Sequence, residues 1–571
     1  MAYDVDVVVA GGGPVGLMLA GELALGGVSV QVLERLAEVD PTMKAGSMNT
    51  PAVAALHRRG MLAELEEAQR QNLARAAEFA RQRAGTAPGA GGSAGRRTPP
   101  RFAGHFAGIM LDGGLLDETD PELAGHGPAD RIGLITQQQV EAMLAGWATR
   151  LGVRIRRGVE LTGLAADEDG VTVTTGEGTV RARWLAGCDG GRSAVRKLAG
   201  FDFPGTDPEI TAYQAIAEMA GTERLGTGWH ATPTGVYAHG PFPGRILTVQ
   251  FTGPRAERDT PVTVEELQAS IRHVTGAEVT VTGITSATRF TDNARQATTY
   301  RHGRVLLAGD AAHVHSPFGG QGLNLGIGDA VNLGWKLAAT IRGWAPDGLL
   351  DTYTTERHPI GAWVLDWTRA QIALMRPDPR ARALRGIVQD LAGTVAGTTY
   401  LVKKISGTWQ RTDLPGDHPL IGAGSLDLEL SDGSRLADHL HDGRALLLDP
   451  SGVLAEVADG YGDRLTIVPL GSPERPALTG LLVRPDGVVA WAADKAAPDE
   501  VIGDAAGPDP SPGRPAGDGP AQVTPDTTGP DQSGNRADAG GRAVDDGLDP
   551  LRAALITWLG TRSAASAAPA R

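Results

Sequence analysis

Short apolar blocks separated by polar stretches run along most of the chain and predict a mixed α/β architecture. Runs of β-branched residues and leucine predict buried strands. A stretch rich in Ala, Leu, Glu and Arg predicts a long helix, and the Gly/Pro-rich patch after it predicts a surface loop. The strands are 5–10, 28–33, 171–173, 304–307 and 445–448, the helix is 61–82 and the loop is 85–100.

The middle of the chain has a different pattern. Residues 213–219 and 246–251 alternate between apolar and polar positions, which is typical of half-buried strands in an antiparallel sheet. One face of such a sheet packs on the core, and the other can line a flat apolar cavity. Four aromatic residues are candidates for that lining, although we favour core packing for each: Trp229, Tyr237, Phe242 and Phe251.

The C-terminal part predicts a hairpin, an insert and a helix. Residues 481–491 alternate around Pro485 and Gly487, which suit a tight turn. Residues 503–547 are rich in Gly, Pro and Asp and contain no Leu, Ile or aromatic residue, so they predict a disordered insert. After the insert, apolar residues at 551, 555, 558 and 559 have the spacing of an amphipathic helix that folds back onto the preceding unit.

The length, net charge and cysteine count of the chain exclude several functional classes. A length of 571 residues implies several domains, and a net charge of −14 argues against a nucleic-acid or membrane-surface binder. The single cysteine, Cys188, cannot form an internal disulfide or a zinc site, so we expect no metal centre. The N-terminus lacks a signal-peptide pattern, and no apolar run reaches about 18 residues, so we expect a cytoplasmic protein.

The first glycine motif predicts a dinucleotide site. The strand 5–10 leads into Gly11, Gly13 and Gly16 and then into a helical stretch, so the motif stands between a strand and a helix. Gly11 permits the tight turn, Gly13 lets a pyrophosphate approach the backbone, and Gly16 allows close helix packing. The next strand ends at Glu34, 23 residues after Gly11, where a carboxylate can accept hydrogen bonds from ribose hydroxyls. FAD and NAD both satisfy this pattern.

Two later motifs carry a resemblance to a known family. Asp189-Gly190-Gly191-Arg192-Ser193 follows a short apolar run, and Gly309-Asp310 ends a strand before Pro317-Phe318-Gly319-Gly320-Gln321-Gly322-Leu323-Asn324. With the first motif, these resemble the single-component FAD-dependent aromatic hydroxylases, the p-hydroxybenzoate hydroxylase class, over most of residues 1–400. No second strand-linked G-x-G-x-x-G occurs, which fits a class that binds NAD(P)H only transiently.

The resemblance implies a fold and a domain division. It implies an α/β FAD-binding Rossmann-like domain made of residues 1–202 and 291–400, and an antiparallel-sheet substrate domain (α+β) over 203–290. The stretch Phe102-Ala103-Gly104-His105-Phe106-Ala107-Gly108 and the variant Lys44-Ala45-Gly46 resemble the branch that oxidises aromatic polyketides, such as anthracycline and angucycline precursors. The length of the chain and the 481–491 hairpin support this resemblance. That branch has a C-terminal thioredoxin-like α/β domain, here 418–560 after a linker at 401–417 and before a disordered tail at 561–571. Without cysteines, its expected role is packing or a homo-oligomer interface.

The resemblance also assigns cofactor residues. Asp310 would hold ribityl hydroxyls, although an N-cap or surface acid is the alternative, and the helix after Gly320 would face the flavin with its positive end. Gln137 would lie against the flavin or simply start a helix. Lys44 stands where many relatives have an arginine, so its contact is less defined. The full set is Gly11, Gly13, Pro14, Val15, Gly16, Glu34, Arg35, Lys44, Gln137, Asp189, Gly190, Gly309, Asp310, Pro317, Gly320, Gly322, Leu323 and Asn324.

The implied reaction uses NADPH or NADH to reduce FAD, and O2 to form a C4a-hydroperoxyflavin that hydroxylates a polycyclic phenolic polyketide in antibiotic biosynthesis. The cofactor supplies most of this chemistry. No catalytic residue is assigned; His105, His313 and Pro317 are weak candidates, and His315 could also move a proton, although a structural role is favoured for each histidine. The alternatives are Baeyer–Villiger or epoxidising oxygenation, and a non-catalytic flavin-binding partner protein.

Overall fold

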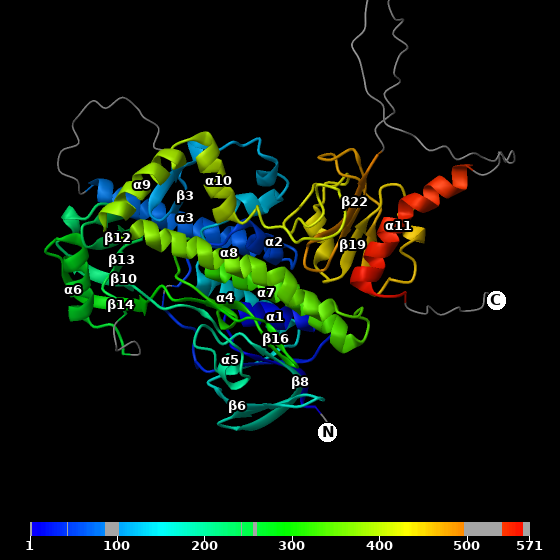
Figure 1. Cartoon of the computed structure of the whole chain (residues 1–571), viewed down its shortest axis with the longest axis horizontal. Helices are drawn as coiled ribbons and strands as arrows, with labels where there is room; N and C mark the ends of the chain where they lie inside the picture. Colours follow the sequence, from blue (N-terminus) through cyan, green and yellow to red (C-terminus); the bar gives the residue numbers. More distant parts are fainter. Residues whose placement is uncertain are drawn as a thin grey trace, which may run out of the picture.

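A sheet of mainly parallel strands carries the N-terminal glycine motif (Figure 1). The computed structural model of the protein describes residues 3–42, 44–85, 102–240, 242–254, 260–495 and 539–562. The strand order is β16-β17-β8-β1-β2-β5; β17, β8, β1, β2 and β5 run parallel, and β6 and β7 extend the sheet beside β8. The strands are β1 (Val5–Ala10), β2 (Val30–Glu34), β5 (Arg154–Arg157), β6 (Leu161–Ala166), β7 (Val171–Thr175), β8 (Gly178–Gly187), β16 (Arg301–His302) and β17 (Val305–Leu307).

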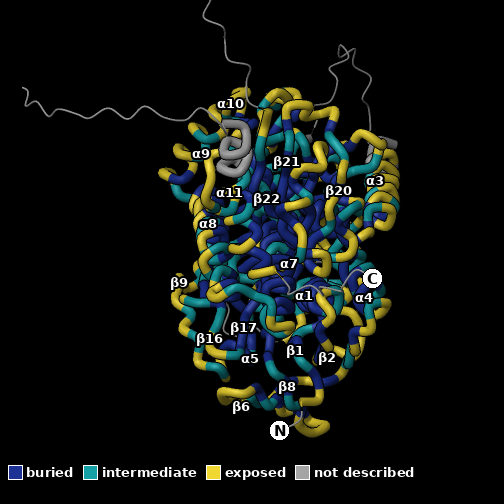
Figure 2. The backbone as a smooth tube through the Cα atoms, turned by 90° about the vertical axis from the view of Figure 1, so that its right-hand side faces the viewer, coloured by how far each residue is buried: buried dark blue, intermediate teal, exposed yellow. Residues whose placement is uncertain are grey.

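Helices cover this sheet and cross the molecule. α1 packs closely on α7 because Gly334 of α7 leaves room for Glu22 of α1, where an added Cβ would lie 2.4 Å from the Glu22 Cβ. Figure 2 shows α7 inside the buried interior, between the parallel sheet and the C-terminal strands. The helices are α1 (Pro14–Leu25), α2 (Thr50–His57), α3 (Leu62–Gly85), α4 (Gln137–Arg150), α5 (Ala194–Leu198), α7 (Gln321–Arg342), α8 (Thr352–Met375), α9 (Pro379–Ala392) and α10 (Val395–Ser406).

The middle unit is a five-stranded antiparallel sheet in the order β11-β12-β13-β10-β14. In β13, Ile246 points to the face that α6 covers, whereas Leu247 and Val249 point to a second apolar cluster with the β3–β4 hairpin and α8. The alternation predicted for 213–219 and 246–251 is therefore confirmed. The elements are α6 (Val264–Thr275), β3 (Phe102–Phe106), β4 (Ile109–Asp112), β10 (Thr211–Ala220), β11 (Gly228–Thr232), β12 (Gly235–His239), β13 (Arg245–Gln250) and β14 (Thr280–Phe290).

A small three-stranded sheet, in the order β18-β15-β9, is formed by β9 (Gly205–Thr206), β15 (Ala294–Gln296) and β18 (His313–Val314). The core packing favoured for the aromatic candidates is confirmed for Tyr237, which is buried. Tyr237 packs with the α6 side of the middle sheet, whereas Trp229 and Phe251 pack against the opposite cluster. Phe242 lies half-buried in the turn before β13.

The C-terminal unit is a four-stranded mixed sheet, β20-β19-β21-β22, packed on α11 (Figure 1). β19 runs parallel to β20 and antiparallel to β21, and β21 forms the predicted hairpin with β22 around Gly487, whose φ is 86°. Leu551, Leu555 and Trp558 of α11 are buried, as predicted. The elements are β19 (Ala445–Leu448), β20 (Leu465–Val468), β21 (Leu478–Val483), β22 (Val489–Asp494) and α11 (Ala539–Leu559).

Three predicted boundaries differ from the structure. α11 starts at Ala539, inside the range predicted as a disordered insert; once 551–559 is anchored, the helix extends backward through residues that include Ala, Arg and Val. α10 ends at Ser406, so the predicted linker 401–417 begins as helix. α3 reaches Gly85, the first residue of the predicted loop, and residues 86–100, the rest of that loop, lie outside the described residues. No helix in the described ranges is long and apolar enough to cross a membrane.

Candidate active site

The three glycines of the first motif have different surroundings. A Cβ on Gly11, whose φ is 107°, would lie 2.3 Å from the carbonyl oxygen of Cys188, and a Cβ on Gly16 would lie 2.0 Å from the carbonyl oxygen of Gly11. Both positions therefore need glycine for the turn and for packing. A Cβ on Gly13 would meet nothing within 4 Å. Gly13 thus leaves open space directly before α1.

That open space faces the start of a helix. Gly13 is the N-cap of α1 and gives it no side-chain cap, and Pro14 occupies the first turn. Uncapped amide groups and the positive end of the helix dipole form a site for an anion such as a pyrophosphate. Val15 of this first turn lies 3.1 Å from the position of a Cβ on Gly309, so the first and third motifs meet.

Glu34 lies beside the same turn at the end of β2. Its Oε2 accepts a hydrogen bond from the Gly12 amide at 2.7 Å, and its Oε1 accepts one from the Leu36 amide at 2.8 Å. Each carboxylate oxygen keeps a second lone pair for a hydroxyl donor. The next residue, Arg35, is exposed, and Lys44 forms an ion pair with Asp40 at 2.8 Å on the surface.

Asp189 and Gly190 lie at the end of β8, next to Gly11. Asp189 Oδ2 accepts hydrogen bonds from the Ala194 and Val195 amides at 2.7 and 3.1 Å. Its Oδ1 is buried, and within the described ranges it has no hydrogen-bond partner. A buried carboxylate oxygen is costly unless it is paired, so this atom fits a ligand hydroxyl better than a ligand phosphate. Gly190 takes a φ of 78° in the turn that follows.

Arg196, in the helix that follows the second motif, is buried. Its guanidinium donates to the carbonyl oxygens of Ala311 and Gly191, both at 2.9 Å, and stacks on Phe203 at 3.8 Å. Arg196 therefore ties the second motif to the third. Arg192 is exposed.

The third motif places an acid and a second helix start close together. Gly309 has a φ of 63°, and its amide donates to Asp329 at 3.0 Å. Asp310 is exposed, and its Oδ1 lies 3.7 Å from the position of a Cβ on Gly322. Gly320, the N-cap of α7, has a φ of 64° and no side-chain cap. The exposed acid and the uncapped helix end therefore face the same space.

Some predicted residues have structural partners instead. Asn324 donates to the Gly320 carbonyl at 2.8 Å and accepts from the Asn49 amide at 2.9 Å, so its amide group holds the loop. Leu323 is buried and Pro317 is exposed beside it in the motif. Gln137 is half-buried at the start of α4, and its backbone amide donates to Ala45 at 3.0 Å.

The histidines of the third motif differ from each other. His313 is fully buried, and its Nε2 bonds to Asp329 Oδ2 at 2.6 Å, while Arg357 bonds to Oδ1 at 2.9 Å. Burial alone would raise the pKa of Asp329, but His313 and Arg357 hold it below its ordinary value. This buried triad joins β18, α7 and α8. His315 donates from Nδ1 to Ser316 at 2.7 Å, and burial lowers its pKa.

Sequence reasoning missed Asp329, Arg357 and Gln371. Asp329 lies five residues after the third motif, and nothing in the sequence pointed to Arg357, which is 28 residues away on α8. Gln371 bonds both to Phe318 of the motif loop and to Ala107 of the β3–β4 hairpin.

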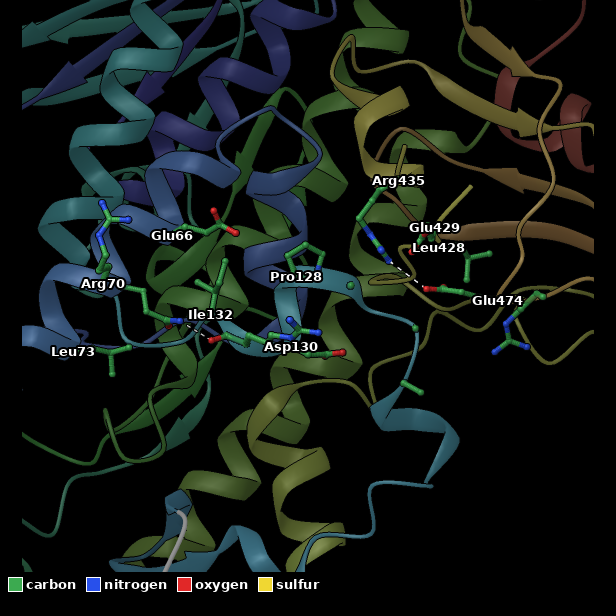
Figure 3. A pocket seen from close by; sticks show the side chains of 16 residues that line it. Glu66, Arg70, Leu73, Pro128, Asp130, Ile132, Leu428, Glu429, Arg435 and Glu474 are labelled. Carbon is green, nitrogen blue, oxygen red and sulfur yellow. Dashed lines mark hydrogen bonds and ion pairs between the residues drawn. The ribbon is translucent and has the colours of Figure 1, made fainter. Parts of the chain in front are cut away.

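A separate groove of about 910 Å³ lies between α3, residues 124–132 and the C-terminal unit (Figure 3). Its walls carry charges of both signs, and Gln69 donates to the Arg131 carbonyl at 2.6 Å across part of it. None of the residues that line it belongs to the glycine motifs. The groove is therefore distinct from the candidate site.

Comparisons with known proteins agree with this geometry. Residues 4–368 match the FAD binding domain family, and residues 418–507 match the C-terminal domain of aromatic-ring hydroxylases. The chain is 40% identical over 516 residues to the 12-dehydrotetracycline 5-monooxygenase/anhydrotetracycline 6-monooxygenase of Streptomyces rimosus, covering 86% of this chain and 95% of that protein. It is also 39% identical over 496 residues to the dialkyldecalin synthase of Streptomyces rugosporus, covering 85% and 96%.

Among solved structures, the chain resembles the anhydrotetracycline hydroxylase OxyS from Streptomyces rimosus, with a TM-score of 0.75, 36% identity, and coverage of 98% of this chain and 100% of that one. The open space at Gly13, the uncapped starts of α1 and α7 and the unpartnered Asp189 oxygen fit FAD. The chain therefore belongs to the FAD-dependent aromatic-ring hydroxylases, a family of flavin monooxygenases.

Proposed function

We propose that this enzyme hydroxylates a phenolic ring of an aromatic polyketide in antibiotic biosynthesis, with NAD(P)H and O2 as co-substrates. The observation that carries the proposal is the meeting of the three glycine motifs around the uncapped starts of α1 and α7. Support for the substrate class comes from the similarity to the anhydrotetracycline hydroxylase along nearly the whole chain.

We infer which residues hold FAD. Gly13, Pro14 and Val15 at the start of α1 would bind the pyrophosphate, and Glu34 would accept hydrogen bonds from the ribose. Asp310 would accept hydrogen bonds from the ribityl chain. The remaining proposed residues shape the site through the backbone or border it: Gly11, Gly16, Arg35, Lys44, Gln137, Asp189, Gly190, Gly309, Pro317, Gly320, Gly322, Leu323 and Asn324.

FAD held by these residues would supply the redox chemistry: hydride acceptance from NAD(P)H and delivery of one oxygen atom of O2 to the substrate and the other to water. The protein positions the cofactor and the substrate and stabilises charge on them. The positive end of α7 stabilises negative charge on the ligand beside Gly320. Trp229, Phe290 and Phe318 form a connected aromatic wall, with ring centroids 6.1 and 5.8 Å apart, which excludes water and suits a flat ring system.

The same proposal divides the chain into domains. Residues 1–202 and 291–400 form the FAD-binding domain, 203–290 form the substrate domain, and 418–560 form a thioredoxin-like domain. The strand order β20-β19-β21-β22 with one helix packed on the sheet supports the last assignment. Since Cys188 is the single cysteine of the chain, this domain has no thiol chemistry. Its role in the proposal is to pack against the FAD-binding domain or against a second copy of the chain.

A direct test uses the purified full chain. We expect a yellow protein that releases FAD on denaturation, and NADPH oxidation that accelerates when anhydrotetracycline is added. Under 18O2 the product should gain one labelled oxygen and lose one aromatic C–H. Ring expansion by one oxygen would instead support Baeyer–Villiger chemistry, and an epoxide would support the epoxidising alternative. A colourless protein that does not take up FAD contradicts the proposal.

The similarity to the dialkyldecalin synthase and to the structure of the Diels-Alderase PyrE3 favours a second candidate, a flavin-binding protein that catalyses a cycloaddition, a reaction that consumes neither O2 nor NAD(P)H. That function predicts bound FAD and an isomeric product of unchanged mass under anaerobic conditions. A flavin-binding partner without turnover would show bound FAD and no product at all. Measuring product mass with and without O2 separates these functions from hydroxylation.

A further inference from the structure

The tip of the β3–β4 hairpin has an unusual backbone. Ala107 has a φ of 52°, the only positive φ at a non-glycine residue within the described ranges, and Gly108 follows with a φ of 77°. Two successive positive φ values define a two-residue hairpin turn that normally takes Asn-Gly or Gly-Gly. Because alanine is strained in this conformation, the surrounding structure must hold the turn in place.

Two side chains of distant helices hold it. The Ala107 amide donates to Gln371 Oε1 at 3.0 Å, and Arg385 donates to the Ala107 carbonyl at 2.6 Å. Gln371 is fully buried on α8, and its Nε2 donates to the Phe318 carbonyl at 3.2 Å. One amide side chain therefore joins the hairpin tip to the loop that precedes α7.

The turn fixes the tautomer of the His105 ring. The Gly108 amide donates to His105 Nδ1 at 3.3 Å, so Nδ1 is an acceptor and Nε2 carries the proton of the neutral ring. Burial, followed by the charge of Arg245, lowers the pKa of His105 to about 4, which keeps the ring neutral near pH 7. His105 is half-buried, and within the described residues its ring is seen in one hydrogen bond, through Nδ1, so Nε2–H is left for a ligand.

His105 lies beside the aromatic wall formed by Trp229, Phe290 and Phe318. Its ring lies 4.6 Å from the ring of Trp229, and a Cβ on Gly108 would lie 3.1 Å from the Trp229 Cβ. Trp229 in turn contacts Phe318 of the loop before α7. Trp229 and Phe318 belong to the apolar cluster between the middle sheet, the β3–β4 hairpin and α8. The His105 ring therefore presents one fixed hydrogen-bond donor, Nε2–H, beside the aromatic rings of Trp229 and Phe318, next to the loop before α7.

We propose that His105 determines substrate specificity: its Nε2–H donates to a phenolate or carbonyl oxygen of the polyketide whose rings pack against Trp229 and Phe318. This inference rests on the proposed function and adds the group that recognises the substrate. A site built to donate to an oxygen discriminates against an analogue that lacks it, because the buried donor is then left unpaired. Arg245, whose guanidinium donates to Gly240 at 2.7 Å, adds positive potential that favours an ionised oxygen.

The first experiment tests the ring itself. The full-length holoenzyme is labelled with 15N-histidine, and the His105 resonances are assigned by comparison with His105→Gln. We expect a neutral Nε2–H ring between pH 6 and 8, and a shift of the Nε2 resonance when anhydrotetracycline is added to saturation. A protonated ring, an Nδ1–H ring, or an unchanged resonance with the probe present would each overturn the inference.

The second experiment measures binding of the same probe by quenching of flavin fluorescence. His105→Phe keeps an aromatic ring but removes the donor, so the Kd should rise roughly ten- to hundred-fold. His105→Gln keeps a donor and should recover most of that loss. His230→Phe is the matched control, since His230 stacks on Tyr237 at 4.8 Å on the opposite face of the sheet, and its Kd should match the wild type.

The outcomes separate the two proposals. Equal Kd values for the wild type and His105→Phe overturn the specificity role and leave the proposed function intact. An enzyme that lacks FAD, or whose NADPH oxidation responds to no polyketide, contradicts the proposed function instead. The flavin absorbance of each variant relative to its protein absorbance shows whether it has folded with its cofactor.

Discussion

At the residue scale, Gly13 and Gly16 have opposite reasons for being glycine. Gly16 is required by the protein itself, because the backbone of Gly11 occupies the place of a side chain. Gly13 has free space around it, so its missing side chain matters only when a ligand approaches the start of α1. Substitution at the two positions should therefore separate folding from FAD binding.

We predict that Gly16→Ala lowers the free energy of unfolding of the FAD-free enzyme by about 2–4 kcal/mol, since the added Cβ clashes with a backbone oxygen. Gly13→Ala should leave that free energy nearly unchanged and raise the Kd for FAD at least ten-fold. Denaturant unfolding and FAD titration measure the two effects. Gly386→Ala, in α9 with no atom near its Cβ position, is the control and should stabilise by about 0.5–1 kcal/mol. Equal FAD affinity of Gly13→Ala and the wild type would contradict the assignment.

At the element scale, the tip of the β21–β22 hairpin is buried against the FAD-binding domain. Arg484, 1% exposed, forms two hydrogen bonds with Glu356 of α8 at 3.0 and 2.8 Å and also bonds to Asp486. Lys336 of α7 lies 3.0 Å from the same Glu356 carboxylate. Arg59, paired with Glu22 of α1 at 2.6 Å, donates to the Pro485 carbonyl at 2.8 Å. The turn therefore bonds directly to Glu356 of α8 and to Arg59, and these two residues link it to Lys336 of α7 and to Glu22 of α1.

Arg484→Met should lower the free energy of unfolding by about 3–5 kcal/mol, because it leaves a buried carboxylate without its partner. The double variant Arg484→Met/Glu356→Gln should recover part of the loss, since Lys336 and Asp486 then balance each other. Arg475→Met, at an exposed arginine outside this cluster, should be near neutral. A double variant less stable than Arg484→Met would show that charge balance is not the cause.

The same cluster predicts that the free energy of unfolding falls at acid pH. Burial alone would raise the pKa of Glu356, but Arg484 and Lys336 lower it from 4.5 to about 2. A carboxylate with a lowered pKa stabilises the fold fully above its unfolded pKa, and this contribution is lost as the pH falls from 4.5 towards 2. We expect Glu356→Gln to remove up to about 3 kcal/mol of that pH dependence in denaturant titrations. Glu160→Gln, at an exposed acid, should keep the wild-type slope, and an unchanged slope in Glu356→Gln would contradict the argument.

At the scale of the whole molecule, α7 connects the candidate active site to the C-terminal unit. Its start lies in the loop of the third motif, and its later residues Trp335 and Ala339 pack in one cluster with Leu555 and Trp558 of α11. Figure 1 shows α7 and α8 running from the middle unit toward the C-terminal sheet. Flavin binding and docking of the C-terminal unit therefore act on the same helix.

This arrangement predicts coupled unfolding. FAD at one hundred times its Kd should stabilise the wild type by about 2.7 kcal/mol, in a single transition followed equally by flavin and tryptophan fluorescence. In Arg484→Met the C-terminal unit should unfold first, so that the two probes give separate midpoints. The test is thermal unfolding at several FAD concentrations, with Arg475→Met as control. Coincident midpoints in Arg484→Met would show that the hairpin tip does not couple the two units.

Elements that depend on neighbouring residues could be predicted from the sequence. The strand, glycine turn, helix and acid between Val5 and Glu34 followed from local apolar runs and backbone sterics, and so did the turn at Gly487. The resemblance of the later motifs led to FAD and to the family. Helix ends were less accurate, as at Ala539, because the end of a helix depends on what anchors it.

The sequence by itself determined the local turns and the motif spacing that identify the flavin family. Only the tertiary structure decided the partners: Arg357 for Asp329, Gln371 for Ala107, and Glu356 for Arg484. These pairs are separated by 28, 264 and 128 residues, and a single sequence contains no periodicity that links such distant positions. Their physical basis is burial, since a polar group removed from water must find its partner wherever the fold places one.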